Sequence, residues 1–76
     1  MKKVDIRLSS IQDVRNFVNI VGKYYIDIDL SSGRYIVDAK SIMGIFSLDL
    51  LQPITLTAQN DDCDDLMEEI KEYIVK

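Results

Sequence analysis

Apolar residues at every second position predict four β-strands in this chain. Such alternation is typical of a strand that packs one face against a core and turns the other toward solvent. It extends over residues 3–8, 24–30, 34–38 and 53–58. We expect the second and third strands to form a hairpin, because Gly33 lies between them and can adopt the positive φ that a tight turn requires.

Apolar residues spaced three and four apart predict a first helix that ends near Val21. Its expected N-cap is Ser10, and Asp13 lies three residues further on, at the spacing of a capping box. We expect Gly22 to end the helix in a left-handed conformation. The predicted inward face consists of Ile11, Val14, Phe17, Val18 and Val21.

A short second helix is predicted over residues 41–48, where apolar residues are too dense for one face to bury. Ser41 is the expected N-cap, because its hydroxyl can accept a hydrogen bond from a free N–H of the first turn. One stripe of this helix can enter the core, which leaves Met43 and parts of Ile42 and Phe46 near solvent. A cluster of exposed apolar side chains on a small protein is a candidate docking surface.

The last helix is predicted to begin at residues 60–62, where acidic side chains favour the positive end of the helix dipole. Its expected buried stripe is Cys63, Leu66, Met67, Ile70, Tyr73 and Ile74. The predicted order is therefore β-α-β-β-α-β-α, in one domain over residues 1–76. A central hairpin with helices elsewhere indicates an α+β open-faced sandwich: a mainly antiparallel sheet with helices on one face and solvent on the other.

Composition and charge limit the classes of function that the chain can have. The chain has 76 residues, of which 47% are hydrophobic and 29% charged, as is ordinary for a globular fold. Its net charge is −4, and seven acids lie from residue 61 onward. Basic residues are scattered, so we expect no nucleic-acid binding. We find no apolar run long enough to span a bilayer and no signal-peptide core, so we expect a cytoplasmic protein without membrane attachment.

The chain offers little catalytic chemistry. It contains no histidine and one cysteine, Cys63, which cannot form an internal disulfide and agrees with a reducing compartment. Without a histidine to activate it, Cys63 is interpreted as a semi-buried helix residue and not as a nucleophile. Acids that begin a helix are usually solvated, so the acidic residues 61–65 do not indicate a metal site. We predict a non-enzymatic protein with no metal and no cofactor.

A resemblance to a known family rests on residues 39–48, AKSIMGIFSL, and on residues 54–58, ITLTA. These segments resemble the HPr family, the histidine-containing phosphocarrier proteins of the bacterial phosphotransferase system. The order of elements and the chain length are also similar. The resemblance implies sheet order 1-4-2-3 with all three helices on one face. It also implies that Ser41 matches a serine which a dedicated kinase phosphorylates in many Gram-positive bacteria, and that Ile42, Met43 and Phe46 match partner-docking residues.

The same resemblance shows a departure at the start of the first helix. HPr carries its phosphoryl group on a histidine in a Gly-x-His-x-Arg-Pro type motif. Alignment from Phe17 places Ser10 at the histidine and Gln12 at the arginine, and the preceding loop is shorter. This degenerate site is therefore predicted to lack phosphocarrier activity, with Ser10 serving as a helix cap.

Two functions remain open from the sequence. One is an HPr-like regulatory or docking module with Ser41 as kinase acceptor, whose partners would be an HPr kinase, phosphotransferase enzymes or a catabolite-control regulator. The alternative is a diverged structural or accessory protein that self-associates through the open sheet face, unrelated to sugar transport. A small-molecule-binding regulatory domain is a weaker third. Ser41 as a plain cap, and Ile42, Met43 and Phe46 as ordinary packing, also remain open. We expect a monomer or weak dimer.

Overall fold

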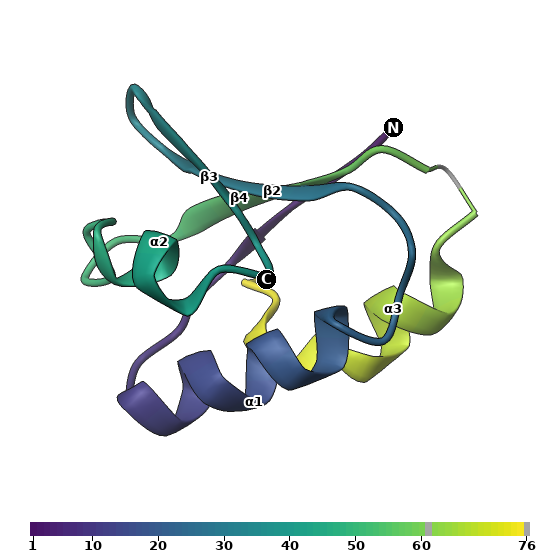
Figure 1. The fold of residues 1–76 in the computed structure, drawn as a ribbon, viewed down its shortest axis with the longest axis horizontal. Coiled ribbons are helices and arrows are strands. Elements are labelled where there is room, and N and C mark those ends of the chain that lie inside the picture. The colour runs from purple at the N-terminus through teal and green to yellow at the C-terminus, as the bar shows by residue number, and fades with distance from the viewer. Residues whose placement is uncertain (61, 76) are drawn as a thin grey trace.

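The computed structural model describes residues 1–60 and 62–75, and its elements follow the predicted order (Figure 1). A 3₁₀ turn, η1, follows the last helix. The elements are β1 Lys2–Ile6, α1 Ile11–Val21, β2 Ile28–Ser32, β3 Tyr35–Asp38, α2 Ile42–Phe46, β4 Ile54–Ala58, α3 Asp64–Glu69 and η1 Lys71–Tyr73.

The four strands form one antiparallel sheet in the order β1-β4-β2-β3, as the family resemblance implied. Leu56 of β4 lies between Val4 of β1 and Leu30 of β2, and Leu30 in turn faces Val37 of β3. This register places an apolar row across the sheet. In Figure 1 the three helices lie on one side of the sheet, with α1 and α3 below it. The open-faced α+β sandwich is therefore confirmed.

The core lies between the sheet and the helices. Phe17 of α1 is fully buried and meets the ring of Tyr73 edge-on, with the ring centroids 6.2 Å apart. The described residues include no buried polar or charged side chain. Aromatic pairs of this geometry stabilise a fold by more than the buried area alone accounts for. Phe17 and Tyr73 therefore hold α1 against the last residues of the chain.

The opposite face of the sheet is polar. Side chains on a strand alternate between its two faces, so the residues that flank the buried ones point outward. By this alternation the outward residues are Lys3, Asp5, Asp29, Ser31, Ile36, Asp38, Thr55 and Thr57. One of these eight, Ile36, is a large apolar residue. The Thr55 hydroxyl donates a hydrogen bond to Asp5 Oδ1 at 3.0 Å.

The second strand is shorter at its start than the alternation predicted. It begins at Ile28 and not at Tyr24, because Ile28 pairs with Ala58, the last residue of β4. One further backbone bond follows, from the N–H of Gln59 to the carbonyl of Asp27 at 2.9 Å, and the chain then turns away with Tyr25 fully exposed. Alternation in residues 24–27 therefore reflects a connection that packs Tyr24 and Ile26 partly against the core.

Two details of α1 were predicted wrongly. Gly22 has φ −64, a right-handed value, and its N–H donates to the carbonyl of Val18 at 2.9 Å, as within an α-helix. The N–H groups of the next two residues, Lys23 and Tyr24, donate to carbonyls three positions back, so the helix ends in a tight turn. Ile11 is 65% exposed and not inward. It is the first residue of α1 and lies at the surface, beside Phe46 and Leu51. Among the described residues, Gly33 alone has a positive φ, 61°, as the hairpin prediction required.

Smaller differences concern where elements end. β1 ends at Ile6 although Leu8 is buried, β3 begins at Tyr35, and α2 ends at Phe46, before the buried Leu48. The last helix begins at Asp64. Asn60 Oδ1 accepts a hydrogen bond from the N–H of Asp62 at 2.9 Å, before the helix begins. Asp61, part of the predicted start, lies outside the described residues.

Candidate functional site

Ser41 caps α2 as predicted. Its backbone is extended, with φ −102 and ψ 107, and its Oγ accepts a hydrogen bond from the N–H of Gly44 at 3.1 Å. The Ser41 N–H donates to the carbonyl of Asp38 at 3.0 Å. These bonds tie the cap both to α2 and to the end of β3. Ser41 as a whole is half-buried.

Gly44 lets α2 lie close to the sheet. A Cβ at this position would lie 3.2 Å from Cβ of Val37 and 3.2 Å from Oγ of Ser41, which is tighter than an ordinary contact. A larger residue would therefore push the helix away from β3 or disturb the cap. The absence of a side chain at residue 44 helps to fix the position of Ser41.

The apolar residues of α2 divide between core and solvent. Ile45 is fully buried, and Leu48 just after the helix is nearly so. Met43 is 79% exposed, Phe46 41% and Ile42 36%. A five-residue helix that packs Ile45 inward cannot also bury residues on its other side. The predicted exposure is confirmed, whereas the docking role of these residues stays a prediction.

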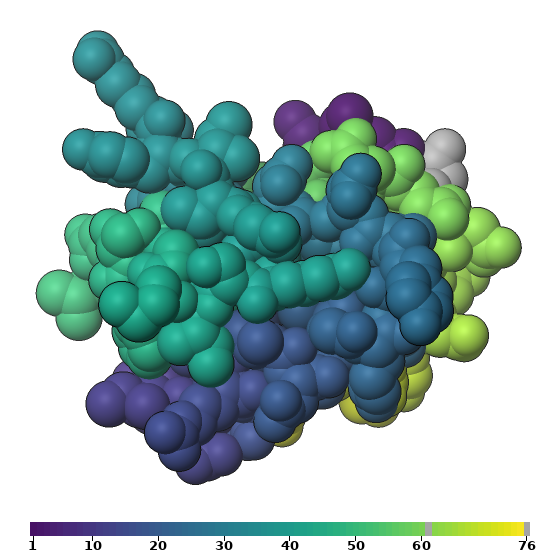
Figure 2. All heavy atoms as spheres, viewed as in Figure 1, coloured from purple at the N-terminus to yellow at the C-terminus, as the bar shows by residue number. Residues whose placement is uncertain are grey.

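The exposed apolar surface continues from α2 to the start of α1, which the sequence did not indicate. A shallow cavity of about 310 Å³ is lined by Leu8, Ser9, Ser10, Ile11, Phe46, Leu50 and Leu51. Arg7 Nη2 donates a hydrogen bond to the carbonyl of Leu51 at 2.9 Å and so fastens this loop to the chain after β1. Figure 2 shows the α2 region directly above the first turns of α1.

We call this combined area the apolar surface, and it consists of Ile11, Ile42, Met43, Phe46 and Leu51. Its members come from the start of α1, from α2 and from the loop that follows α2. Only the periodicity of α2 pointed to part of it. The position of Ile11 depends on how α1 is placed, and that of Leu51 depends on the loop before β4.

Side chains at the start of α1 accept hydrogen bonds from the backbone N–H groups there. Ser10 Oγ accepts the N–H of Asp13 at 3.1 Å, and Asp13 Oδ2 accepts the N–H of Ser9 at 3.0 Å. In a regular capping box this second bond would come from the N–H of the cap residue, Ser10. Here it comes from the N–H of Ser9, one residue earlier. Gln12 Nε2 donates to Asn16 Oδ1 at 3.0 Å, along the helix. A carboxylate therefore occupies the end of α1 where an anion would otherwise bind.

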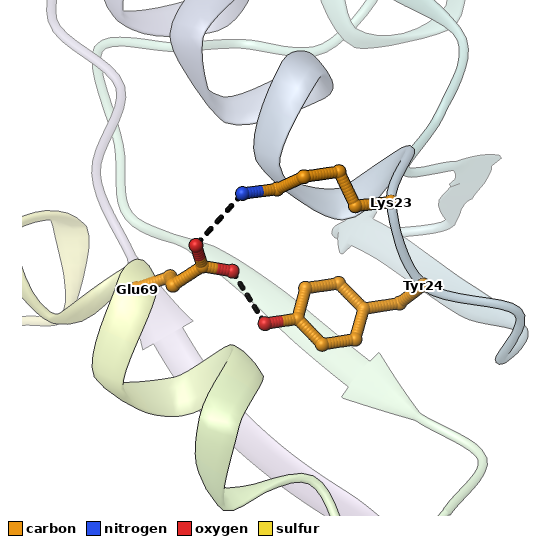
Figure 3. A network of polar contacts seen from close by, with 3 residues as sticks. All are labelled: Lys23, Tyr24 and Glu69. Carbon is orange, nitrogen blue, oxygen red and sulfur yellow. Dashed lines mark hydrogen bonds and ion pairs between the residues drawn. The ribbon is translucent and has the colours of Figure 1, made fainter.

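A polar network joins the end of α1 to α3 (Figure 3). Lys23 Nζ lies 2.8 Å from Glu69 Oε1, and the Tyr24 hydroxyl donates to the other carboxylate oxygen. The hydrogen bond to Glu69 raises the pKa of Tyr24 to about 12. The hydrogen bonds from Lys23 and Tyr24 hold the pKa of Glu69 below its usual value. These groups are on the surface and serve to connect two helices.

The described residues contain no group of three or more side chains arranged to hold a metal ion. Within residues 1–60 and 62–75, no helix has the length and apolar character needed to cross a membrane.

The fold and the capped helix together define a small open-faced α+β sandwich. A family model described as "PTS HPr component phosphorylation site" matches residues 12–76. The chain therefore belongs to the HPr family, whose members are phosphocarrier proteins of the phosphotransferase system. A comparison with curated proteins found no match.

Solved structures agree with this assignment. The chain is similar to HPr-C-His from Thermoanaerobacter tengcongensis, with a TM-score of 0.79 and 29% identity over 95% of this chain and 89% of that one. It is similar to the phosphocarrier protein HPr from Bacillus anthracis str. Ames, with a TM-score of 0.71 and 28% identity over 97% and 94%. It is also similar to Crh, the catabolite repression protein of Bacillus subtilis, with a TM-score of 0.66 and 26% identity over 93% and 88%. That Crh structure is a swapped, intertwined dimer.

Proposed function

We propose that this HPr-family protein is a regulatory docking module that does not carry phosphoryl groups on its first helix, and that Ser41 is its phosphoryl acceptor. The observation that carries the proposal is the contrast between two sites. Ser41 lies at the edge of the apolar surface, whereas Ser10 and Gln12 stand at the degenerate carrier site in a chain without histidine.

The loss of carrier activity follows from chemistry. Phosphoryl transfer through a carrier needs a group that accepts and readily gives up the phosphoryl group, as an imidazole nitrogen does. A serine ester at Ser10 is too stable for this, and its Oγ already accepts the N–H of Asp13. The carboxylate of Asp13 also repels a second anion at the same place. We expect no stoichiometric labelling from phosphoenolpyruvate and the general upstream enzyme, and such labelling would contradict the proposal.

Phosphorylation at Ser41 is compatible with the fold. The Oγ would attack the γ-phosphorus of ATP, a new O–P bond would form, ADP would leave, and the hydroxyl proton would pass to a base of the kinase. The phosphate oxygens would lie beside the N–H of Gly44, which Oγ now accepts at 3.1 Å. The change adds a charge of about −2 next to Ile42, Met43 and Phe46. It would therefore alter which partners this surface binds.

The acceptor is tested by incubation with an HPr kinase and ATP, followed by intact-mass measurement. We expect wild type to gain the mass of one phosphoryl group and Ser41→Ala to gain none. Ser10→Ala is the matched control, because both serines cap a helix through a bond of 3.1 Å to the residue three positions on. It should gain the same mass as wild type. An unchanged wild-type mass, or a gain in Ser41→Ala, would refute Ser41 as the acceptor.

The docking role is tested by pull-down with phosphotransferase enzymes and with a catabolite-control regulator as separate baits. Met43→Asp should reduce capture, because Met43 is the most exposed residue of α2. Tyr25→Asp is the control, since Tyr25 is also exposed but lies in the connection before β2. Equal capture of both variants would show that the apolar surface is not where these partners bind.

The alternative, self-association through the open sheet face, lacks support in the described part of the chain. A face that buries itself in a stable dimer is apolar at its centre. Here Thr55 and Thr57 occupy the central strand β4, and Asp5 and Asp29 flank it.

A further inference from the structure

One edge of the sheet is covered and the other is free. Beside β1, the N–H of Arg7 donates to the carbonyl of Tyr73 at 2.8 Å, and the N–H of Val75 donates to the carbonyl of Asp5 at 2.9 Å. The end of the chain therefore closes that edge. In the described residues β3 pairs with β2 alone, and the hairpin projects away from the body of the molecule (Figures 1 and 2).

The free edge presents backbone groups and apolar side chains. The N–H of Ala39 donates to the carbonyl of Ile28 at 2.9 Å, which identifies this as a hydrogen-bonded pair. Hydrogen-bonded pairs alternate with non-hydrogen-bonded pairs along an antiparallel ladder, so the backbone N–H and C=O groups of Val37 and Tyr35 also point toward β2. The backbone N–H and C=O of Ile36 therefore point away from β2, toward the free edge. The side chain of Ile36 is 70% exposed, and that of Tyr35 is equally open. An unpaired edge of this kind is a template for another strand.

The segment along this edge is complementary to itself. Residues 34–38 read Arg-Tyr-Ile-Val-Asp. If two copies pair antiparallel about a two-fold axis at Ile36, Arg34 lies opposite Asp38 of the second copy, and the reverse pair also forms. Ile36 then faces Ile36, and Tyr35 faces Val37. Opposite charges and apolar pairs across neighbouring strands are both favourable.

We propose that β3 binds β3 of a second copy of this chain and joins the two sheets into one of eight strands. The strand has four residues, so the interface is small and the dimer should be weak and in rapid exchange. Its two inter-copy charge pairs are exposed, so added salt should weaken it. The proposal concerns the sheet edge and is independent of the role of Ser41.

The pairing is tested by sedimentation velocity over protein concentrations up to about 1 mM at low salt. Wild type should show a concentration-dependent dimer. Arg34→Glu and Asp38→Arg each place two like charges opposite one another and should weaken the dimer about tenfold. An equimolar mixture of these two variants restores opposite charges at both positions. It should therefore associate as strongly as wild type, which a general effect on folding would not produce.

A second pair of variants keeps the test decisive if Asp38→Arg does not fold, because Asp38 Oδ1 also accepts the N–H of Lys40. Ile36→Lys places two ammonium groups together at the two-fold axis and should abolish the dimer. Thr57→Lys, on the same face but in the inner strand β4, should leave it unchanged. The proposal is overturned by a protein that stays monomeric at 1 mM, by a dimer that survives Ile36→Lys, by one that Met43→Asp abolishes, or by a slowly exchanging swapped dimer.

Discussion

Two helices of this protein begin with the same local device and differ in everything around it. Ser10 and Ser41 each lie in extended backbone, and each accepts, at 3.1 Å, an N–H from the residue three positions on. The first cap begins an eleven-residue helix that buries Val14, Phe17 and Val21 completely. The second begins a five-residue helix that buries Ile45 and leaves Met43 open.

The difference teaches that a serine cap by itself says nothing about function. At Ser10 the neighbouring carboxylate of Asp13 bonds to the N–H of Ser9 and makes the site anionic. At Ser41 no acid lies in the first turn of the helix, and the helix that it caps carries the exposed apolar side chains Ile42, Met43 and Phe46. A serine hydroxyl therefore has a structural role at Ser10 and is a candidate phosphorylation site at Ser41.

The largest difference between the two helices should appear in their aromatic residues. Phe17→Ala removes a fully buried ring and should lower the free energy of unfolding by about 3–5 kcal/mol. Phe46→Ala removes a ring that is partly in solvent and should lower it by about 1 kcal/mol. Urea denaturation measures both. Since a domain of this size can lose its fold through the first change, Phe17→Leu supplies a milder comparison. Equal losses at both positions would mean that α2 belongs to the core.

The two caps themselves should have similar energetic effects. Ser10→Ala and Ser41→Ala each remove one side-chain bond to a helical N–H and should each lower the free energy of unfolding by about 1 kcal/mol. Thermal or urea unfolding measures the losses, and Ser41→Asp should retain most of the stability because aspartate also caps helices. A negligible effect at Ser41 would show that α2 is held by packing alone.

The smallest effect concerns the network that anchors the end of α1. The pKa of Glu69 is lowered in the folded protein, so its contribution to stability is present above the ordinary value of 4.5 and is lost as pH falls through the lowered pKa. The pKa of Tyr24 is raised to about 12, so its contribution is complete below 10 and is lost as pH rises toward 12.

Glu69→Gln should therefore be less stable than wild type at neutral pH, and the difference should shrink at both extremes. Urea unfolding at a series of pH values measures it, with Glu68→Gln as control, because the exposed Glu68 forms its ion pair with Lys71, three residues further along the chain. The same pH profile in both variants would mean that Glu69 does not couple α3 to α1 through Tyr24.

The spacing of apolar residues predicted most of the helices and strands, because an element that is buried on one face repeats apolar residues at a fixed interval. Ile54, Leu56 and Ala58 are buried as their alternation predicted. It failed at Tyr24–Ile26 because a strand also needs a partner, and the length of β4 decides that. It failed at Ile11 because helical spacing identifies a face but not whether other elements cover every residue on that face.

The sequence by itself determined the order of elements, the two serine caps, the exposed side of α2 and the lack of an imidazole, since each depends on residue type or on short-range spacing. Only the tertiary structure decided that Ile11 and Leu51 join Phe46 in one surface, that the chain end closes β1, and that β3 stays open. These features arise where distant segments meet, and no local pattern of residues records which segments will be neighbours.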